Sequence, residues 1–412
     1  MKSLKLWKTA SSEMQYKINT SIIYNYLLEN EPISRATISK NLGISAPVVS
    51  NIIKKLIEKN FVIETVKGEP NNKKSGKKPI LLEINDKKSN VLGIDLGKSK
   101  FKIALSDSKG NIISKRTTFK IKDDKDITKK ILNEIKDITR SHKNLDMVCV
   151  AIPAAVNPEE GRIIGGVIYK EWEKINFKKI LEESLKIPVM IENDVNLSAL
   201  AEKYYGKGKN ITDMIFLEIS SGIGTGIIID NNLFKGFKGL SGEIGFSVLD
   251  VNKLKIKYKE KGFLEEYASV DALQYQAQKK ITDGKNSIIL DMVKGDIKKI
   301  DSSIVCKAAL QGDSLANNIV SYMADLLSIT IINMVLFMDT QLVVLGGDIC
   351  ILPGIEDLFL KPIKNNVENI VPYEIPKIEV SGLGSDAGVV GASLYAIQSL
   401  VMNEFPFKIG KF

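Results

Sequence analysis

The chain has little histidine and little cysteine: one histidine, His142, and three cysteines in 412 residues. This excludes a metal site built from several histidines, and a Ser-His-Asp triad would depend on His142 alone. His142 stands beside a lysine and is interpreted as a surface residue. Cys149, Cys306 and Cys350 are far apart in apolar surroundings, which indicates buried thiols instead of a disulfide framework or a metal cluster.

Long apolar runs are also missing. The longest ones fall well short of the roughly 20 residues that a membrane-spanning helix needs, and residues 1–20 lack the apolar core of a secretory signal. We therefore expect no membrane partner and a cytoplasmic protein. Hydrophobic residues make up 44% and charged residues 26%, which is ordinary globular usage, and the length suggests two or three domains.

Positive charge is concentrated near the N-terminus. Residues 1–90 contain 16 lysines and arginines against 8 acidic residues, so +8 of the net charge of +9 lies in this segment. A basic terminal module on a nearly neutral body is typical of a nucleic-acid-binding domain joined to another domain. A solvated lysine-rich surface would give the same count, so the residue pattern has to decide.

Three helices are predicted in this basic segment, at 18–28, 35–42 and from Ser45 onward. Apolar residues at helical spacing predict buried faces on all three. Ser34 and Ser45 are predicted N-caps, and Gly43 ends the second helix. The faces predicted to be buried are Ile18, Ile22, Ile23, Tyr26 and Leu27; Ala36, Ile38 and Leu42; and Val49, Ile52, Ile53, Leu56 and Ile57.

The short connection between the second and third helices is typical of a helix-turn-helix, whose second helix enters the major groove of double-stranded DNA. The start of that helix would meet the bases, where Asn51 suits adenine and Ser50 suits a base or a phosphate. Lysines further along and Arg35 would meet the backbone. The predicted DNA-contacting residues of the helices are Arg35, Ser45, Ala46, Pro47, Ser50, Asn51, Lys54 and Lys55.

A β-hairpin with a basic tip is predicted after the third helix. Residues 61–66 and 80–84 read as strands, and the segment between them is rich in Gly, Pro, Asn and Lys. This is the pattern of a wing, with Lys77 and Lys78 placed to follow phosphates. A solvated loop is the alternative interpretation of the tip.

From residue 91 onward, apolar strands alternate with amphipathic helices, which is α/β patterning. A strand, a Gly-rich turn and a second strand occur at 91–106 and recur at 214–229, which suggests two similar lobes. Gly-rich turns expose backbone N–H groups to phosphate oxygens, although each turn alone is a weak signal.

Six segments, in this order, resemble motifs of the ROK family (repressors, open reading frames and kinases): GIDLG at 93–97, IENDVN at 191–196, ISSGIGTG at 219–226, GLSGEIG at 239–245, VLGGD at 344–348 and LGSDAG at 383–388. The resemblance covers essentially the whole chain. It implies an α/β protein in which a winged helix-turn-helix (1–88) precedes a two-lobed, actin-like sugar-kinase (ribonuclease H-like) ATPase fold. The small lobe would comprise 89–205 and about 389–412, and the large lobe 206–388.

The resemblance implies a sugar site formed by Asn193, Asp194, Glu243 and Glu265, whose carboxylates and amide suit hydroxyl groups. The residue that matches Asp194 is the catalytic base in the family's kinases, and here we interpret it as a binding ligand. Repressors of the xylose and N-acetylglucosamine type carry a winged helix-turn-helix and a basic segment that GKKP at 76–79 resembles, whereas the kinases lack this module.

Three departures from the family pattern bear on cofactors. Phe246 replaces the zinc-binding histidine, and apolar or aromatic residues replace the cysteines, namely Ile256, Tyr258 and Phe263, so we expect no zinc and a loop held by packing. Lys98 replaces a glycine of the phosphate turn, and Pro153-Ala154 replaces Pro-Gly near the sugar site. We therefore expect no ATP cofactor and regard the phosphate turns as degenerate: Asp95, Gly97, Ser99, Gly222, Gly224 and Thr225.

Taken together, these features predict a sugar-responsive DNA-binding repressor without physiological kinase activity. We expect a homodimer, or a tetramer, on paired half-sites of an operator, with xylose or glucose as the effector that relieves repression. Linkage equally permits a sugar that tightens DNA binding. The alternative function is an ATP-dependent, glucokinase-like sugar kinase with an accessory DNA-binding domain, which Asp194 and the second Gly-rich turn keep open and Lys98 opposes.

Overall fold

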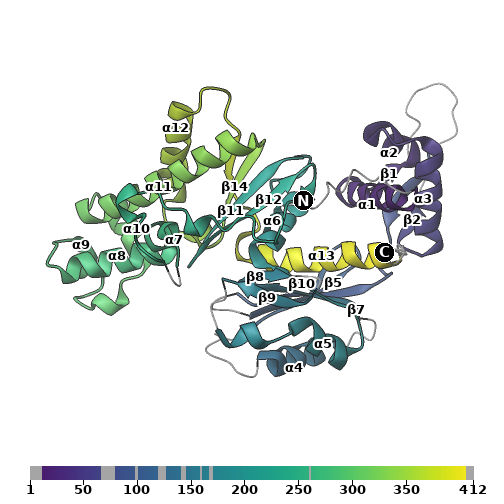
Figure 1. Cartoon of the computed structure of the whole chain (residues 1–412), viewed down its shortest axis with the longest axis horizontal. Coiled ribbons are helices and arrows are strands. Elements are labelled where there is room, and N and C mark those ends of the chain that lie inside the picture. Colours follow the sequence, from purple (N-terminus) through teal and green to yellow (C-terminus); the bar gives the residue numbers. More distant parts are fainter. Residues whose placement is uncertain are drawn as a thin grey trace, which may run out of the picture.

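Three helices and a small sheet form the N-terminal module, coloured purple in Figure 1. The computed structural model describes residues 12–65, 79–97, 101–118, 127–140, 145–157, 160–166, 170–258 and 261–404. The strands pair antiparallel in the order β1-β3-β2, so the predicted hairpin is confirmed. The elements are α1 (Ser12–Asn30), β1 (Ile33–Ser34), α2 (Arg35–Leu42), α3 (Ala46–Glu58), β2 (Val62–Thr65) and β3 (Leu81–Ile84).

Local signals account for the ends of α2, whose predicted bounds are confirmed. The Ser34 hydroxyl accepts a hydrogen bond from the Thr37 N–H at 3.2 Å, and Gly43 ends the helix with φ of 66°. The predicted cap of α3 is confirmed in its position only. Ser45 occupies the N-cap position without a side-chain hydrogen bond, because Pro47 removes one of the two N–H groups that such a cap uses.

The face that α1 buries agrees with the predicted one at Ile23 and Leu27 only. The core side contains Thr20, Ile23, Tyr24 and Leu27, whereas Ile18 and Ile22 are 49% and 41% exposed. All of these residues have helical spacing, and the neighbouring domain decides which of them are covered. Ala36 was also predicted to be buried and is exposed, whereas Ile38 on the same helix is fully buried.

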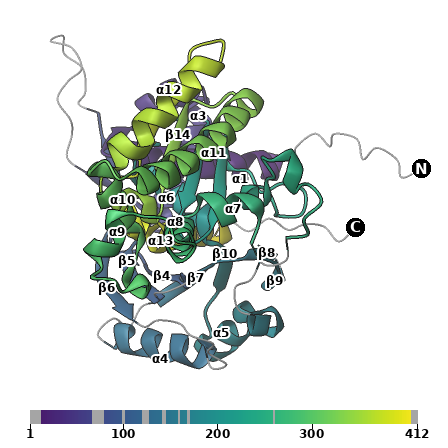
Figure 2. The same ribbon diagram turned by 90° about the vertical axis from the view of Figure 1, so that its left-hand side faces the viewer.

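The small lobe is a five-stranded sheet in the order β10-β7-β4-β5-β6. Helices α4 and α5 cover one face, and α13 and α6 cover the other (Figure 2). Its elements are β4 (Asn90–Asp95), β5 (Phe101–Asp107), β6 (Ile112–Thr118), α4 (Ile127–Thr139), β7 (Leu145–Ile152), the hairpin β8 (Ala155–Asn157) and β9 (Arg162–Gly165), the 3-10 turn Lys170–Lys174, α5 (Phe177–Leu185), β10 (Val189–Asn193), α6 (Asp194–Tyr205) and α13 (Ala387–Glu404).

The large lobe is a second sheet, β13-β12-β11-β14-β15, packed against a layer of helices. Within the described residues, α11 is the one helix long and apolar enough to cross a membrane, and it packs into the core of this lobe. The elements are β11 (Met214–Ile219), β12 (Ile223–Ile229), β13 (Asn232–Leu233), α7 (Phe263–Ala268), α8 (Val270–Thr282), α9 (Ile288–Met292), α10 (Ser302–Leu310), α11 (Ser314–Met338), β14 (Leu342–Gly346), α12 (Lys361–Ile370) and β15 (Lys377–Val380).

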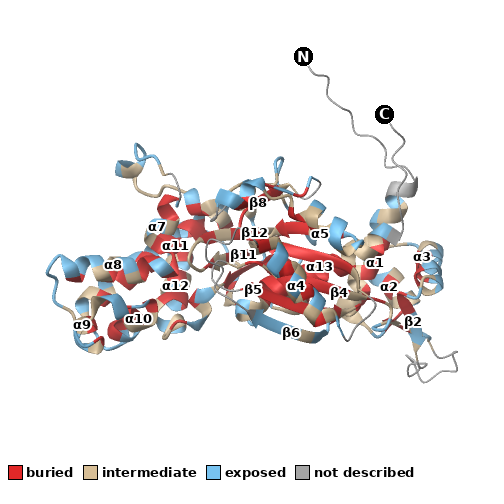
Figure 3. Ribbon diagram, turned by 90° about the horizontal axis from the view of Figure 1, so that it is seen from below, coloured by how far each residue is buried: buried red, intermediate tan, exposed pale blue. Residues whose placement is uncertain are grey.

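Two helices, α6 and α13, connect the N-terminal module, the small lobe and the large lobe. The last helix, α13, returns from the large lobe to the small-lobe sheet and continues toward α1 (Figure 1). Buried side chains of α1, α3, α6, β4 and α13 form one continuous apolar cluster. Figure 3 shows in red the buried residues of the whole molecule. The N-terminal module therefore shares a core with the small lobe.

Candidate DNA-binding surface and predicted sugar site

Helix α3 presents its predicted DNA-contacting side to solvent. The buried side contains Val49, Ile52, Ile53 and Leu56, while Ile57 is partly buried. Lys54 lies 3.8 Å from Glu58, and the Lys55 ammonium lies over the Tyr16 ring, so both lysines are held on this side. The exposed residues are Ser45, Ala46, Pro47, Ser50, Asn51, Lys54 and Lys55.

Arg35, the other predicted phosphate contact on a helix, has a partner within the protein. Its guanidinium donates a hydrogen bond to the Glu64 carboxylate at 2.7 Å, which joins α2 to strand β2 of the wing. The Arg35 side chain is 29% exposed. It is therefore positioned by the wing at the edge of the module. Lys77 and Lys78, predicted at the wing tip, lie outside the described residues.

Asn193 and Asp194 lie where β10 ends and α6 begins. The Asn193 side chain accepts a hydrogen bond from the Asn196 N–H at 3.0 Å and donates one to the Ala154 carbonyl at 3.1 Å. The Asp194 carboxylate accepts from the Val195 N–H at 2.9 Å. Both predicted sugar ligands are thus fixed at the first turn of α6, beside the segment in which Ala154 replaces the family's glycine.

Glu243 and Glu265 come together in the large lobe. Glu265 on α7 accepts hydrogen bonds from the Ile223 N–H at 3.1 Å and the Gly262 N–H at 3.3 Å, and so joins the second Gly-rich turn to α7. Partial desolvation and the nearby Glu265 carboxylate raise the pKa of Glu243. Glu243 is exposed and available to a ligand, whereas Glu265 also has a structural role.

A charged cluster next to these residues was not predicted from the sequence. Glu192 is 2% exposed and forms an ion pair with Lys235, whose ammonium also donates a hydrogen bond to the Tyr395 hydroxyl at 3.2 Å. These residues come from β10, the segment after β13, and α13. Although burial opposes it, Glu192 raises the pKa of Lys235. The cluster joins the two lobes, and its Glu192 directly precedes Asn193. The position of Glu192 within the IENDVN motif was the signal from which the cluster could have been predicted.

The first predicted phosphate turn lies next to α13. The Asp95 carboxylate faces Gly388, where an added Cβ would come within 2.8 Å of its oxygen. Burial raises the pKa of Asp95 to about 6, against the opposing effects of Lys102 and the Gly97 N–H. Lys102 lies 3.2 Å from the Asp386 carboxylate and also contacts the Ser385 carbonyl. Ser99, the remaining predicted residue of this turn, is outside the described part of the chain, as is Lys98.

We expect Asp95→Asn to stabilise the protein at pH 8 but not at pH 4. The folded-state pKa of about 6 exceeds the ordinary value of 3.8, so ionisation penalises the folded state increasingly as the pH rises between these values. The penalty corresponds to at most about 3 kcal/mol. Urea unfolding at both pH values measures it, and an equal effect at pH 4 and pH 8 would contradict the assignment.

The second predicted phosphate turn packs closely against α6. Gly224 and Gly226 approach α6 so closely that an added Cβ would lie 2.9 Å from Val195 and 2.4 Å from Ala199. Side chains alternate along a strand, so Thr225 faces the opposite side of the sheet, toward α11. Its side chain is buried there, and its part in a phosphate turn stays a prediction. Gly222 lies at the turn, where its carbonyl accepts from the Ser220 N–H at 2.9 Å.

The loop at which the family's zinc ligands are replaced is held partly by aromatic packing. Phe263 is fully buried between Tyr258 and Tyr267, with ring centroids 6.3 Å and 4.9 Å away. Phe246 and Ile256 are instead 44% and 48% exposed, so only part of the predicted set is held by packing. The absence of zinc stays a prediction.

The junction between the DNA-binding module and the body contains a buried ion pair that was also not predicted. The Lys203 ammonium on α6 binds the Glu29 carboxylate on α1, and their side chains are 1% and 11% exposed. Nearby, Lys109 lies 3.1 Å from Glu31 and 3.2 Å from Glu83. Helix α13 contributes a further hydrogen bond, from the Gln398 amide to the Asn25 side chain at 3.0 Å. Two lysines and one amide, from α6, the β5–β6 turn and α13, thus hold α1 and the residue that follows it.

Comparison with known proteins agrees with this architecture. The ROK family profile matches residues 91–399, and a winged helix-turn-helix DNA-binding profile matches residues 20–63. The fold predicted from the sequence is confirmed by a ROK family transcriptional regulator, a homologue of the E. coli MLC protein, whose structure superposes with a TM-score of 0.78 at 22% identity and covers 95% of this chain and 98% of that one.

Two relatives of known name differ in class. The chain is 28% identical over 394 residues to a xylose repressor of Caldicellulosiruptor bescii, covering 93% of this chain and 96% of that protein. It is 29% identical over 314 residues to a glucokinase of Halalkalibacterium halodurans, covering 73% and 92%. The family profile spans most of the chain. The chain therefore belongs to the ROK family and carries an N-terminal winged helix-turn-helix DNA-binding module.

Proposed function

We propose that the protein is a sugar-responsive transcriptional repressor that binds operator DNA through its winged helix and releases it when a sugar binds between the lobes. One observation carries the proposal. Helix α6 begins with the predicted sugar ligands Asn193 and Asp194 and ends in the turn where Lys203 pairs with Glu29 of the DNA-binding module. A single rigid element thus spans the predicted sensing site and the output domain.

The residues at the sensing end suit a polyol. Carboxylates accept hydrogen bonds from hydroxyl groups, and an amide both donates and accepts. Asp194 and Glu243 belong to different lobes, so a sugar that contacts both would favour one arrangement of the lobes over another. Such differential affinity is the requirement for a ligand to shift a conformational equilibrium.

The path to the DNA-binding module follows from the packing. Helix α6 has 12 residues and is about 18 Å long. It lies directly against α13, where an added Cβ at Gly391 would come within 1.8 Å of the Leu197 carbonyl oxygen. Both helices contact α1. A rotation of one lobe that moves this helix pair would carry α1 with it and change the position of α3 relative to DNA.

The acting form in this proposal is a cytoplasmic homodimer on paired half-sites, because each chain supplies one winged helix. It uses neither zinc nor ATP. Xylose is the first candidate effector and glucose the second. The name of the C. bescii relative supports xylose, since that protein and this chain align over almost their full lengths.

A sugar kinase with an accessory DNA-binding domain is the second candidate. The similarity to a glucokinase and the position of Asp194 at the end of β10 favour it. Two observations oppose it. The Thr225 hydroxyl lies on the α11 side of the sheet, away from α6. Asp386, which lies near Asp95, forms ion pairs with Lys102 and Lys115. Sugar-dependent ADP formation at about 1 to 1000 per second would establish the kinase.

The test is fluorescence anisotropy on DNA from the protein's own promoter region, titrated with pentoses and hexoses at fixed salt. We expect one sugar to release the DNA. Asn51→Ala should weaken DNA binding by about 1 to 3 kcal/mol. Asp194→Asn should leave DNA affinity unchanged and abolish the response to sugar. Tight binding that no sugar alters would reject the sensing mechanism and leave DNA binding intact.

A further inference from the structure

A buried carboxylate lies between the predicted sugar ligands of the small lobe and the large lobe. Glu192 directly precedes Asn193 on β10, and one of its oxygens accepts hydrogen bonds from the Asn193 N–H at 3.0 Å and the Asn196 amide at 3.1 Å. The other oxygen pairs with the Lys235 ammonium of the large lobe. One carboxylate thus fixes the turn that carries the sugar ligands and also holds the opposite lobe.

Lys235 and Glu243, the predicted sugar ligand of the large lobe, lie on one short segment whose ends are tied together. The Ser241 hydroxyl donates a hydrogen bond to the Phe234 carbonyl at 2.6 Å. The Ser241 N–H donates another to the Lys235 carbonyl at 3.2 Å. These bonds close the segment into a compact loop, so a displacement of Lys235 is passed on to Glu243.

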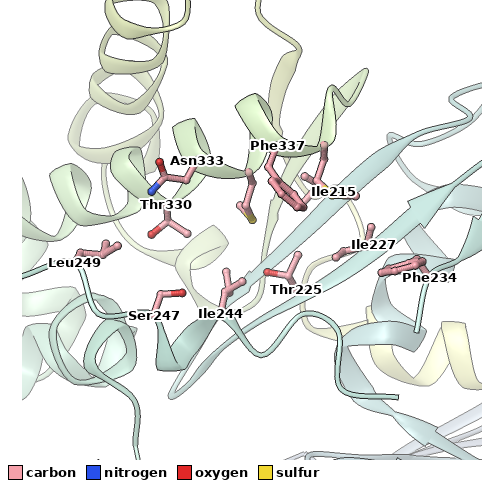
Figure 4. Close-up of a pocket in the computed structure, with 12 residues that line it drawn as sticks. Ile215, Thr225, Ile227, Phe234, Ile244, Ser247, Leu249, Thr330, Asn333 and Phe337 are labelled. Atoms are coloured by element: carbon pink, nitrogen blue, oxygen red, sulfur yellow. The ribbon is translucent and has the colours of Figure 1, made fainter. Parts of the chain in front are cut away.

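This loop is fixed to the large-lobe sheet at both ends. The Phe234 N–H donates a hydrogen bond to the Ile227 carbonyl at 2.8 Å, and the Gly242 carbonyl accepts one from the Thr225 N–H at 3.0 Å. Phe234 and Ile244, which flank the loop, both line a cavity between β12 and α11 (Figure 4). The loop therefore moves with β12 and not independently of it.

A second small-lobe partner holds the Lys235 side chain. Its ammonium donates a hydrogen bond to the Tyr395 hydroxyl at 3.2 Å and lies 5.2 Å from the centre of the Tyr395 ring. Tyr395 belongs to α13, which covers the small-lobe sheet. The side chains of Lys235 and Glu192 are 31% and 3% exposed, so water and salt screen this pair less than a surface pair.

We propose that the ion pair between Glu192 and Lys235 is a spacer that sets the distance between the two halves of the predicted sugar site. In the small lobe, the ligands Asn193 and Asp194 directly follow the spacer carboxylate. In the large lobe, Glu243 lies on the same closed loop as the spacer ammonium. A change in the length of the ion pair therefore changes the gap that a sugar has to span. This inference rests on the proposed function.

The packing between the lobes leaves the ion pair this role. Gly226 on β12 approaches α6 so closely that an added Cβ would lie 2.4 Å from the Ala199 side chain. This contact fixes where the lobes touch, and the angle between them is the remaining freedom, which the spacer restricts. Xylose and glucose differ by one hydroxymethyl group, and a binding site has to be held within about 0.5 Å to use such a difference. Glu192 and Lys235 are thus positioning residues that affect which sugar fits.

Isothermal titration calorimetry with xylose and with glucose tests the effect on binding. Lys235→Met should raise the dissociation constant of the preferred sugar roughly 10- to 100-fold, because the ligands of the two lobes lose their spacing. The matched control is Lys238→Met, which removes an exposed positive charge from the same loop and should have no effect.

Lys235→Arg distinguishes a spacer from an ion pair that only stabilises the fold. The guanidinium keeps the charge and can still pair with Glu192, so most of the sugar affinity should return. Because the guanidinium is larger, it should hold the lobes further apart and shift the ratio of the two dissociation constants roughly 3-fold or more in favour of glucose. An ion pair that only stabilises the fold would leave this ratio unchanged.

The distance between the lobes is measured without sugar by double electron–electron resonance. Nitroxides are attached at Lys129→Cys on α4 and Lys298→Cys in the large lobe, both exposed positions. Cys350→Ser removes the partly exposed native thiol, and dilution with unlabelled protein removes distances between chains. We expect Lys235→Met to shift or broaden the distance by roughly 2 Å or more, and Lys238→Met to leave it unchanged.

The double variant Glu192→Gln with Lys235→Met guards against misfolding, because it leaves no buried charge without a partner. It should show the same change in lobe distance, with folding checked by circular dichroism. A lobe distance that does not depend on Lys235, or a Lys235→Arg protein with the original sugar preference, would overturn the spacer. If no protein binds either sugar while the lobe distance still depends on Lys235, the proposed effectors are rejected and the spacing result stands.

Discussion

Glu29→Ala is expected to lower the free energy of unfolding by about 3 to 5 kcal/mol, the usual cost of leaving one member of a buried ion pair without its partner. The remaining Lys203 ammonium has a side chain only 1% exposed, so water cannot solvate it. Denaturant unfolding measures the loss. Glu183→Ala removes the exposed partner of Lys179, at 3.9 Å, and should leave stability nearly unchanged.

The double variant Glu29→Leu with Lys203→Met separates stability from signalling. Replacing both charges by apolar side chains of similar size should restore most of the lost stability. DNA affinity should then be close to that of the unmodified protein, while the effect of sugar on DNA affinity becomes smaller because α6 no longer holds α1 through the ion pair. An unchanged sugar response in this variant would show that α13 alone transmits the signal.

Gly391→Ala is expected to destabilise the protein by about 2 to 3 kcal/mol. Inside a helix this substitution normally stabilises by about 1 kcal/mol, so the sign is reversed by one contact. The new Cβ would lie 1.8 Å from the Leu197 carbonyl oxygen, and backbone cannot rotate out of the way as a side chain can. Helix α13 would have to move away from α6.

The matched control is Gly382→Ala, because an added Cβ there meets no atom within 4 Å and the residue does not have a positive φ. Thermal unfolding of both variants measures the difference. A stabilised Gly391→Ala protein would mean that α6 and α13 lie further apart than the contact between Gly391 and the Leu197 carbonyl oxygen requires. We also expect this variant to bind DNA with a weakened sugar response, since the α6 and α13 pair is the proposed path.

Features determined by near neighbours could be predicted from the sequence. The bounds of α2 follow from the Ser34 cap and from Gly43, which both act within a few residues. The exposed start of α3 and the pairing of β2 with β3 follow from periodicity and from the turn-rich segment between the strands. The order of the ROK motifs extended this reasoning to the fold of the body, for which periodicity alone gave only an α/β class.

Features determined by distant contacts could not be predicted. Lys203 is a lysine near the end of a helix and has the sequence pattern of a solvated residue. It is nevertheless buried against α1, where its partner Glu29 lies 174 positions earlier in the chain. Ile18 and Ile22 were predicted to be buried together with Ile23 and Leu27, and which of these residues is covered depended on where the body lies. Thr225 belongs to a Gly-rich motif, but strand register turns its hydroxyl toward α11.

The position of α13 has a consequence for synthesis on the ribosome. The winged helix precedes the body, while α13, which completes the small-lobe core and touches α1, is translated roughly 300 residues later. At about 5 to 20 residues per second, this delay is roughly 15 to 60 s. A nascent chain thus exposes a basic, DNA-competent module before the helix that positions it exists. Until α13 emerges, this module is tethered to the chain without the orientation that the finished protein gives it.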